Sequence, residues 1–222
     1  MTTNSDMRQV FDFLRRLAAN NDRTWFKAHK DEYDRLRKAW EADIARLIGL
    51  VGDYDDAVRG LAVRDAVYRI YRDVRFSPDK SPYKRYFSAV LGRGGRHTVM
   101  SSYYVHFEPG QLMLCGGVWW PERPILNRLR SLIDAEGDEF RKIVGNPELT
   151  SRYHWECDTL KTMPRDYSVD NPMAEYLKMK EYILVMRPDD DYFFCDDWVA
   201  RVAADLRPLQ PLHAFLNYVF DE

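Results

Sequence analysis

The spacing of hydrophobic residues changes near residue 67, and this change constrains the fold more than any other feature of the sequence. Between residues 6 and 47, apolar side chains recur at helical spacing, first over 6–19 and then from Trp25 to Leu47. From residue 67 to about residue 120 apolar and polar side chains alternate, and turn residues separate the alternating runs. The sequence therefore predicts an antiparallel β meander over about 67–120, with one more strand near 181–187.

Helices are expected before and after this meander. The stripe from Trp25 to Leu47 predicts one long amphipathic helix. Near the C-terminus, Pro208 and Pro211 are expected to separate two helices, with Asp196 or Asp197 as the N-cap of the first. The chain has 222 residues, of which 45% are hydrophobic, so one core is large enough to hold it together. We predict an α+β fold in a single domain spanning residues 1–222.

Composition and charge narrow the class of protein. The formal net charge of −2 provides no general attraction to nucleic acid or to an anionic membrane. The N-terminus lacks a signal-peptide pattern, and no apolar run approaches the ~18 residues of a membrane span. The sequence therefore predicts a cytoplasmic protein that neither spans nor enters a membrane.

The cysteines and histidines predict no metal site. The three cysteines are odd in number and far apart, which supports neither a disulfide framework nor a zinc ribbon and fits a reducing cytosol. The stretch "HWEC", residues 154–157, could supply metal ligands, but no second cluster lies at a matching spacing. No cofactor is predicted, and the oligomeric state is left open.

Charge is unevenly distributed along the chain. Residues 61–100 carry nine Lys or Arg and three Asp, a local charge of +6. Six of these cations fall within "RIYRDVRFSPDKSPYKRYF", residues 69–87, beside only two acids. The stretch "RPDDDYFFCDD", residues 187–197, holds five Asp and one Arg, and could face either the basic segment or solvent.

If residues 69–76 form a strand, their side chains alternate between two faces. The core-facing set would be Ile70, Arg72, Val74 and Phe76, and the opposite set would be Arg69, Tyr71, Asp73 and Arg75. An arginine on the core face needs a carboxylate or carbonyl partner, because an unpaired buried charge is costly. We therefore expect structural roles for Arg72, Phe76 and Asp79.

The opposite face predicts a ligand site. Planar guanidinium groups bind phosphate and carboxylate oxygens bidentately, and a turn at residues 77–80 could bring lysines and a tyrosine to the same face. The ligand contacts that we predict are Arg69, Tyr71, Arg75, Lys80, Tyr83 and Lys84. The alternative is a solvated face whose charges pair with each other, since surface pairs of this kind need no ligand.

Several stretches resemble one known family. They are "NNDRTWFKAHKDEY" at 20–33, "RIYRDVRFSPDKSPYK" at 69–84, "YYVHFEPG", "CGGVWWPE" and "MPRDYSVDNP" at 163–172. Together they are similar to the bacterial and fungal family known as DUF2461 or TIGR02453, whose function is unknown. The resemblance implies a single α+β domain and no particular reaction. It also implies that the family's signature positions are occupied by Arg69, Arg72, Asp73, Arg75, Phe76, Asp79, Lys80 and Tyr83.

Candidate catalytic residues are few. Asp73 could orient the arginines or act as a base, and His106 lies on a predicted strand face near the proposed ligand. His29 lies on an apolar helical stripe, where a hydrogen-bonded core histidine is the commoner role. Gly116 and Gly117 lie within a strand pattern, which predicts a bulge or a close approach of another part of the chain.

Three functions fit these observations. The first is binding of a small phosphate- or carboxylate-bearing ligand at the Arg/Lys/Tyr cluster, with or without catalysis. The second is binding of single-stranded nucleic acid through the basic segment and nearby tyrosines, which the near-neutral net charge disfavours. The third is a non-enzymatic interaction module in which the Arg/Asp network is structural.

Overall fold

The computed structural model describes residues 6–220, and its centre is a five-stranded antiparallel sheet. The spatial order of the strands is β1-β2-β3-β5-β4. Their bounds are β1 Phe87–Leu91, β2 Ser102–Phe107, β3 Met113–Val118, β4 His154–Trp155 and β5 Tyr182–Met186. The α+β class, the antiparallel pairing and the strand predicted near 181–187 are therefore confirmed.

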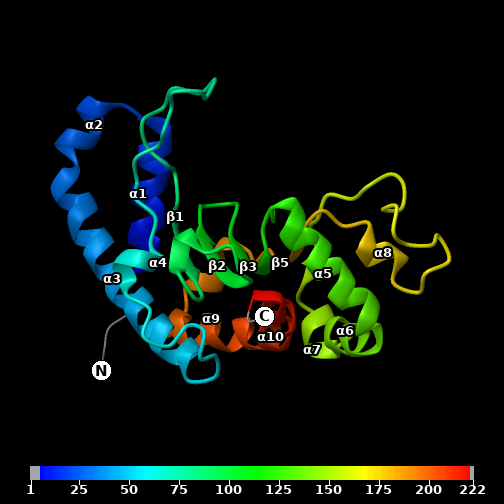
Figure 1. Cartoon of the computed structure of the whole chain (residues 1–222). Coiled ribbons are helices and arrows are strands. Elements are labelled where there is room, and N and C mark those ends of the chain that lie inside the picture. The colour runs from blue at the N-terminus through cyan, green and yellow to red at the C-terminus, as the bar shows by residue number, and fades with distance from the viewer. Residues whose placement is uncertain (1–5, 221–222) are drawn as a thin grey trace.

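Helices from the N-terminal, middle and C-terminal parts of the chain flank this sheet (Figure 1). The N-terminal group lies to one side of the strands, α9 and α10 lie beneath them, and α5 to α8 form a lobe on the other side. The helices are α1 Met7–Ala19, α2 Arg23–Ala28, α3 Lys30–Gly52, α4 Val63–Ala66, α5 Arg123–Ala135, α6 Gly137–Val144, α7 Pro147–Thr150, α8 Ala174–Leu177, α9 Trp198–Leu206 and α10 Gln210–Asn217. None of these helices is both long and apolar enough to cross a bilayer.

The helix predicted to run unbroken from Trp25 is divided at His29, so that prediction is wrong. Asp22 caps α2, α2 ends at Ala28, and α3 begins at Lys30. The imidazole Nδ1 of His29 lies 2.8 Å from the carbonyl oxygen of Trp25, and its ring stacks on the Trp25 indole. The Trp25 carbonyl oxygen therefore bonds to both the side chain and the backbone N–H of His29 at the joint. The spacing of apolar residues does not reveal this contact.

The prolines near the C-terminus do separate two helices, as predicted. The carboxylate of Asp197 accepts the amide N–H of Ala200 at 2.9 Å and caps α9. A short 3-10 turn over Arg207–Leu209 then leads into α10.

The sheet has one face packed against helices and one face without a helical layer. Phe87, Val105 and Phe107 are fully or almost fully buried on the helix side. Because successive residues of a strand point to opposite faces, Tyr104 and His106 point away from the helices. The register places His106 between Ser88 of β1 and Met113 of β3 on this open face.

Two glycines in β3 allow close packing around the sheet, as the sequence predicted. A Cβ at Gly116 would lie 2.6 Å from Nε2 of His213 in α10. Gly117 has a φ of +142°, and a Cβ there would lie 1.7 Å from the carbonyl oxygen of Tyr182. Neighbouring parts of the chain therefore fill the space that side chains would need.

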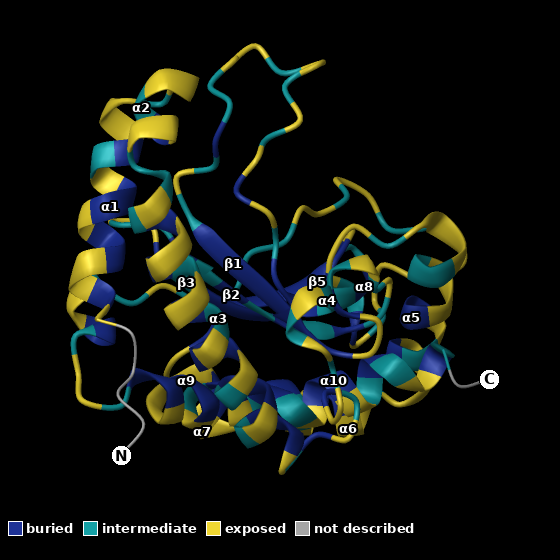
Figure 2. Cartoon of the chain, turned by 90° about the vertical axis from the view of Figure 1, so that its left-hand side faces the viewer, coloured by how far each residue is buried: buried dark blue, intermediate teal, exposed yellow. Residues whose placement is uncertain are grey.

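Residues 67–86 are an irregular extended hairpin and not the regular strand predicted at 69–76. Isolated bridges join Val67 to Ala89 and Tyr71 to Tyr83. Pro78 and Pro82 have no amide hydrogen, so the returning arm cannot complete a ladder. The tip of the hairpin projects beyond the body of the molecule beside α1 and α2 (Figures 1 and 2).

The expectation that Phe76 faces the core is wrong for the same reason. Phe76 is 96% exposed at the projecting tip, whereas Ile70 near the base is 2% exposed. Alternation separates a core face from a solvent face only where the core covers one face of the strand, and the projecting tip has no core beside it.

We expect Gly117→Ala to lower the melting temperature sharply, because a Cβ would collide with the Tyr182 carbonyl in a backbone region that favours glycine. The cost should be roughly 3 kcal/mol or more. Gly49→Ala in α3 is the matched control, because nothing lies within 4 Å of a Cβ at that position. It should raise stability by about 0.5–1 kcal/mol. Equal melting temperatures for the two variants would contradict the packing at β3.

Candidate functional site

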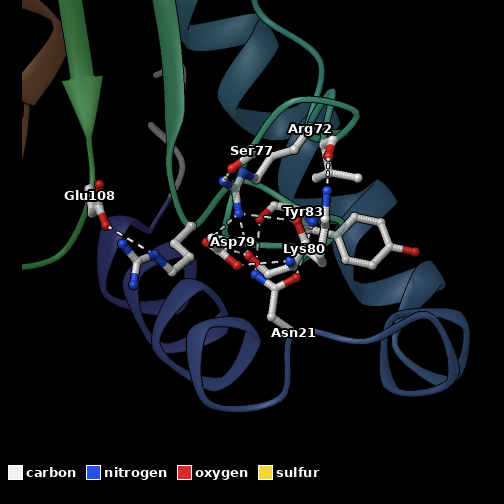
Figure 3. A network of polar contacts seen from close by, with 10 residues as sticks. Asn21, Arg72, Ser77, Asp79, Lys80, Tyr83 and Glu108 are labelled. Atoms are coloured by element: carbon white, nitrogen blue, oxygen red, sulfur yellow. Dashed lines mark hydrogen bonds and ion pairs between the residues drawn. The ribbon is translucent and has the colours of Figure 1, made fainter.

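The tip of the hairpin is held together by Arg72. Its guanidinium donates to the Asp79 carboxylate, to the Ser81 carbonyl oxygen at 3.1 Å and to the Ser77 hydroxyl at 3.2 Å (Figure 3). Asp79 also accepts the Ser81 amide N–H at 2.9 Å. Hydrogen bonds from Ser81 and then from Arg72 lower the pKa of Asp79 to about 2. Arg72 therefore binds groups of its own loop.

The other charges at the tip are also engaged locally. Arg75 donates to both oxygens of the Asp73 carboxylate, and its side chain is 77% exposed. The Lys80 ammonium donates to the carbonyl oxygen of Val74 at 2.9 Å. Three residues that we predicted at a ligand site, Asp73, Arg75 and Lys80, thus lie together on the projecting tip and bind one another or the backbone.

The two predicted tyrosines lie on the side of the hairpin that faces α2. The Tyr83 ring is buried and stacks on Phe26 with ring centroids 4.0 Å apart. The side-chain amide of Asn21 binds both the N–H and the carbonyl oxygen of Tyr83 (Figure 3). Tyr71 is 49% exposed and packs edge-on against Phe26. Asn21 and Phe26 therefore anchor the hairpin to the N-terminal helices.

Lys84 faces a different environment from the tip residues. It lines a cavity of about 500 Å³ on the open face of the sheet, with its ammonium 4.8 Å from the Tyr68 ring centroid and 5.7 Å from that of Tyr86. Burial, followed by the nearby guanidinium groups of Arg69 and Arg37, lowers the pKa of Lys84. Among residues 6–220 no carboxylate lies within ion-pair distance of Lys84 or Arg69.

We call this cavity the open-face pocket. Its floor is the apolar part of the open sheet face, which includes Met113, Cys115 and Ile183. Its polar wall is formed by Tyr68, Lys84, Tyr86, Arg96, Tyr104 and His106. The side chain of Arg96 donates to the Val67 carbonyl oxygen at 3.1 Å, which ties the loop after β1 to the start of the hairpin. Strands β1 to β3 and both flanking loops therefore build one concave surface.

A chain of hydrogen bonds runs along β2 at the edge of this pocket. The Tyr104 hydroxyl lies 2.9 Å from Nδ1 of His106, and Nε2 of His106 lies 3.2 Å from the Glu108 carboxylate. Burial raises the pKa of Tyr104, so the phenol keeps its proton and donates it to Nδ1. With Nε2–H donating to Glu108, the imidazole is fixed in one tautomer. The chain can take up a proton at Nδ1 of His106, through the Tyr104 hydroxyl, in the same pocket that Lys84 lines.

Of the three candidate catalytic residues, only His106 lines the open-face pocket. His29 stacks on Trp25 at the joint between α2 and α3, and Asp73 lies on the projecting tip. Tyr68 and Arg96 were not predicted as site residues, and Tyr86 and Tyr104 were predicted only among the tyrosines of the nucleic-acid alternative. The alternation of Tyr104, His106 and Glu108 was the available signal, because it places all three on one strand face.

Two carboxylates of the acidic segment 187–197 pair with arginines of the N-terminal helices. Asp190 pairs with Arg15 of α1 and accepts the Gly110 amide N–H at 2.7 Å. Asp197 pairs with Arg46 of α3. In "HWEC", the carboxylate of Glu156 binds His154 and Arg187. No group of three or more potential metal ligands occurs within residues 6–220.

We expect Arg72→Gln to make the hairpin tip susceptible to chymotrypsin at Phe76, the fully exposed aromatic residue of the loop. Loss of the guanidinium removes the contacts to Asp79, Ser81 and Ser77, so the loop opens more often and cleavage after Phe76 accelerates several-fold. The measurement is the cleavage rate under native conditions, read by mass spectrometry. Arg75→Gln is the control and should leave the rate unchanged, because Arg75 bonds only to Asp73 at the exposed tip. Equal rates in both variants would contradict this assignment.

Comparison with known proteins gives a family and no function. No curated protein and no solved structure matches the chain. A family model described as a conserved hypothetical protein, DUF2461, matches residues 9–215, which include the hairpin, the whole sheet and nearly all of the helices. The resemblance noted in the sequence is therefore confirmed, and the chain belongs to the DUF2461 family.

Proposed function

We propose that the protein binds a small phosphate- or carboxylate-bearing ligand in the open-face pocket, with Lys84 as its charge partner. The observation that carries this proposal is the half-buried Lys84 ammonium, which lies between two tyrosine rings and has no carboxylate partner among residues 6–220. A desolvated cation without a counter-ion is unfavourable, and a bound anion would offset that cost.

The walls of the pocket suit an anion with an attached organic group. The hydroxyls of Tyr68 and Tyr86 keep their protons at neutral pH, since burial raises the pKa of each phenol, and they can donate to an anion. Arg69 adds positive charge near Lys84. The apolar floor of Met113, Cys115 and Ile183 offers contact for a carbon skeleton, as in most small-molecule sites.

The predicted ligand contacts divide into two groups in this proposal. Lys84 remains a ligand contact, whereas Arg69 is exposed, does not line the pocket and only adds positive charge nearby. Arg75 and Lys80 are replaced by Tyr68, Tyr86 and Tyr104, because the tip residues are engaged locally. Tyr71 and Tyr83 become anchors of the hairpin on α2.

Catalysis on the bound ligand is consistent with the Tyr104–His106–Glu108 chain. The Tyr104 oxygen would accept a proton from the bound ligand while its own proton passes to Nδ1 of His106. The carboxylate of Glu108 would stabilise the imidazolium formed in that step. No substrate or reaction class follows from this geometry alone.

Binding of single-stranded nucleic acid is the less favoured alternative. Few cations of the basic segment are free for phosphates, since Arg72 and Arg75 pair with Asp79 and Asp73. An interaction module with a structural Arg/Asp network describes the tip of the hairpin, but it leaves the position of Lys84 without an explanation.

We expect inorganic phosphate or phenyl phosphate to raise the melting temperature of the protein at constant ionic strength, and Lys84→Met to abolish this effect. Without ligand, Lys84→Met should melt at the same temperature or higher, because burial opposes the charged form of Lys84. A ligand at about 100 times its dissociation constant would add ~2.7 kcal/mol of stability.

The control is Lys80→Met, which removes an equal charge from the tip and should keep the full response to phosphate. Equal responses of wild type and Lys84→Met would refute the assignment of the site to Lys84. Tight binding of an oligothymidine that weakens steeply with salt would favour the nucleic-acid alternative.

A further inference from the structure

A second cavity, of about 860 Å³, lies beside α5 and shares no lining residue with the open-face pocket. It is bounded by the chain that joins β3 to α5, by α5 itself, by residues 158–166 and by Lys180 and Glu181. In Figure 1 these elements belong to the lobe on the far side of the sheet from the N-terminal helices. We call this cavity the α5 pocket.

Arg130 of α5 brings a buried positive charge to this pocket. The residue is 6% exposed, and its Nη2 donates to the Met179 carbonyl oxygen at 2.8 Å. Its Nε is fully buried and has no hydrogen-bond acceptor. Among residues 6–220 no carboxylate lies within ion-pair distance of Arg130. A guanidinium in this state is incompletely paired, and an anion would complete it.

Glu181 brings a buried negative charge to the same pocket. It is 7% exposed, and its carboxylate accepts a long hydrogen bond of 3.4 Å from the Trp120 amide N–H. No cation lies within ion-pair distance of Glu181 in the described part of the chain. Two buried groups of opposite charge therefore line one cavity without pairing to each other.

The backbone at Trp120 supports a binding role for this pocket. Trp120 has a φ of +43°, the only positive φ at a non-glycine residue within 6–220, and its indole is 70% exposed. This conformation is rare for a bulky residue, and such strain concentrates at binding and catalytic sites. Here it aims the Trp120 amide at Glu181 and leaves a flat aromatic ring at the border of the cavity.

We propose that the α5 pocket binds a free α-amino acid with an apolar side chain. The carboxylate of the ligand would pair with Arg130 and its ammonium with Glu181, while its side chain packs on Leu126, Leu160 and Met163. A purely anionic ligand would leave Glu181 unpaired, and a purely cationic one would leave Arg130 unpaired. Only a ligand that carries both charges can pair with both Arg130 and Glu181. This requirement distinguishes the α5 pocket from the anion site at Lys84.

Isothermal titration of the wild-type protein with L-leucine and L-phenylalanine tests the proposal, with N-acetyl-L-leucine and L-leucinamide as derivatives that each lack one charge. We expect saturable binding of at least one free amino acid, and binding at least about tenfold weaker for both derivatives of leucine. Absence of saturable binding by either amino acid at millimolar concentration would overturn the proposal. So would a derivative that binds as tightly as leucine.

Two variants assign the charges to residues. Glu181→Gln should remove the preference for L-leucine over N-acetyl-L-leucine, and Arg130→Gln should remove the preference for L-leucine over L-leucinamide. Lys84→Met is the control and should bind L-leucine as the wild type does, because Lys84 lies in the other pocket. The derivative series on the wild-type protein decides the question even if a variant fails to fold. Phosphate binding at Lys84 can succeed or fail independently of these results.

Discussion

Helix α10 packs on strand β3 at a separation that only glycine permits, since a Cβ at Gly116 would lie 2.6 Å from the His213 imidazole. His213 is itself buried, and its Nδ1 binds the Ser101 hydroxyl at 2.7 Å at the start of β2. This contact joins the C-terminal helix to two strands and keeps the helical layer on one face of the sheet. The other face lacks a helical layer, so the chain around β1 and β2 folds over it and forms a pocket.

Charge in this protein is balanced in some places and left unbalanced in others. At the hairpin tip, Arg72 and Arg75 have carboxylate partners two to seven residues away. At the base of the hairpin Lys84 lies beside two tyrosine rings and has no carboxylate partner among residues 6–220. Beside α5 the buried Arg130 contacts a carbonyl oxygen and the Tyr182 hydroxyl, and no carboxylate of residues 6–220 pairs with it. Incompletely paired charges reduce stability, and proteins commonly retain them where a ligand supplies the missing partner.

Two consecutive tryptophans connect the two regions. Trp119 lines the open-face pocket and Trp120 lines the α5 pocket. Both lie directly after β3, in which Gly117 has a positive φ and lies close to the Tyr182 carbonyl oxygen. The "CGGVWWPE" stretch therefore has a packing role at its glycines and contributes to both cavities at its tryptophans.

The class of fold and much of the order of its helices and strands follow from local sequence patterns. The switch from helical to alternating spacing, the glycines in β3 and the prolines between α9 and α10 act through local backbone geometry, which neighbouring residues specify. Sequence alone failed at His29, where a side chain bonds to the backbone, and at residues 69–76, where the hairpin projects away from the core and neither face is covered. It also could not place Phe76, which is exposed at the tip.

Which charged side chains have partners depends on how distant parts of the chain pack together. Arg69, Arg75, Lys80 and Lys84 look equivalent in the sequence, because each is a cation in one short basic segment. The fold carries Arg75 and Lys80 outward on the hairpin tip, where Asp73 and a backbone carbonyl lie within reach. It turns Lys84 toward the open face of the sheet, beside Tyr68 and Tyr86 of the two hairpin arms. Whether a cation is neutralised depends on distances between residues far apart in the chain, and those distances are fixed only when the sheet and its helices pack together.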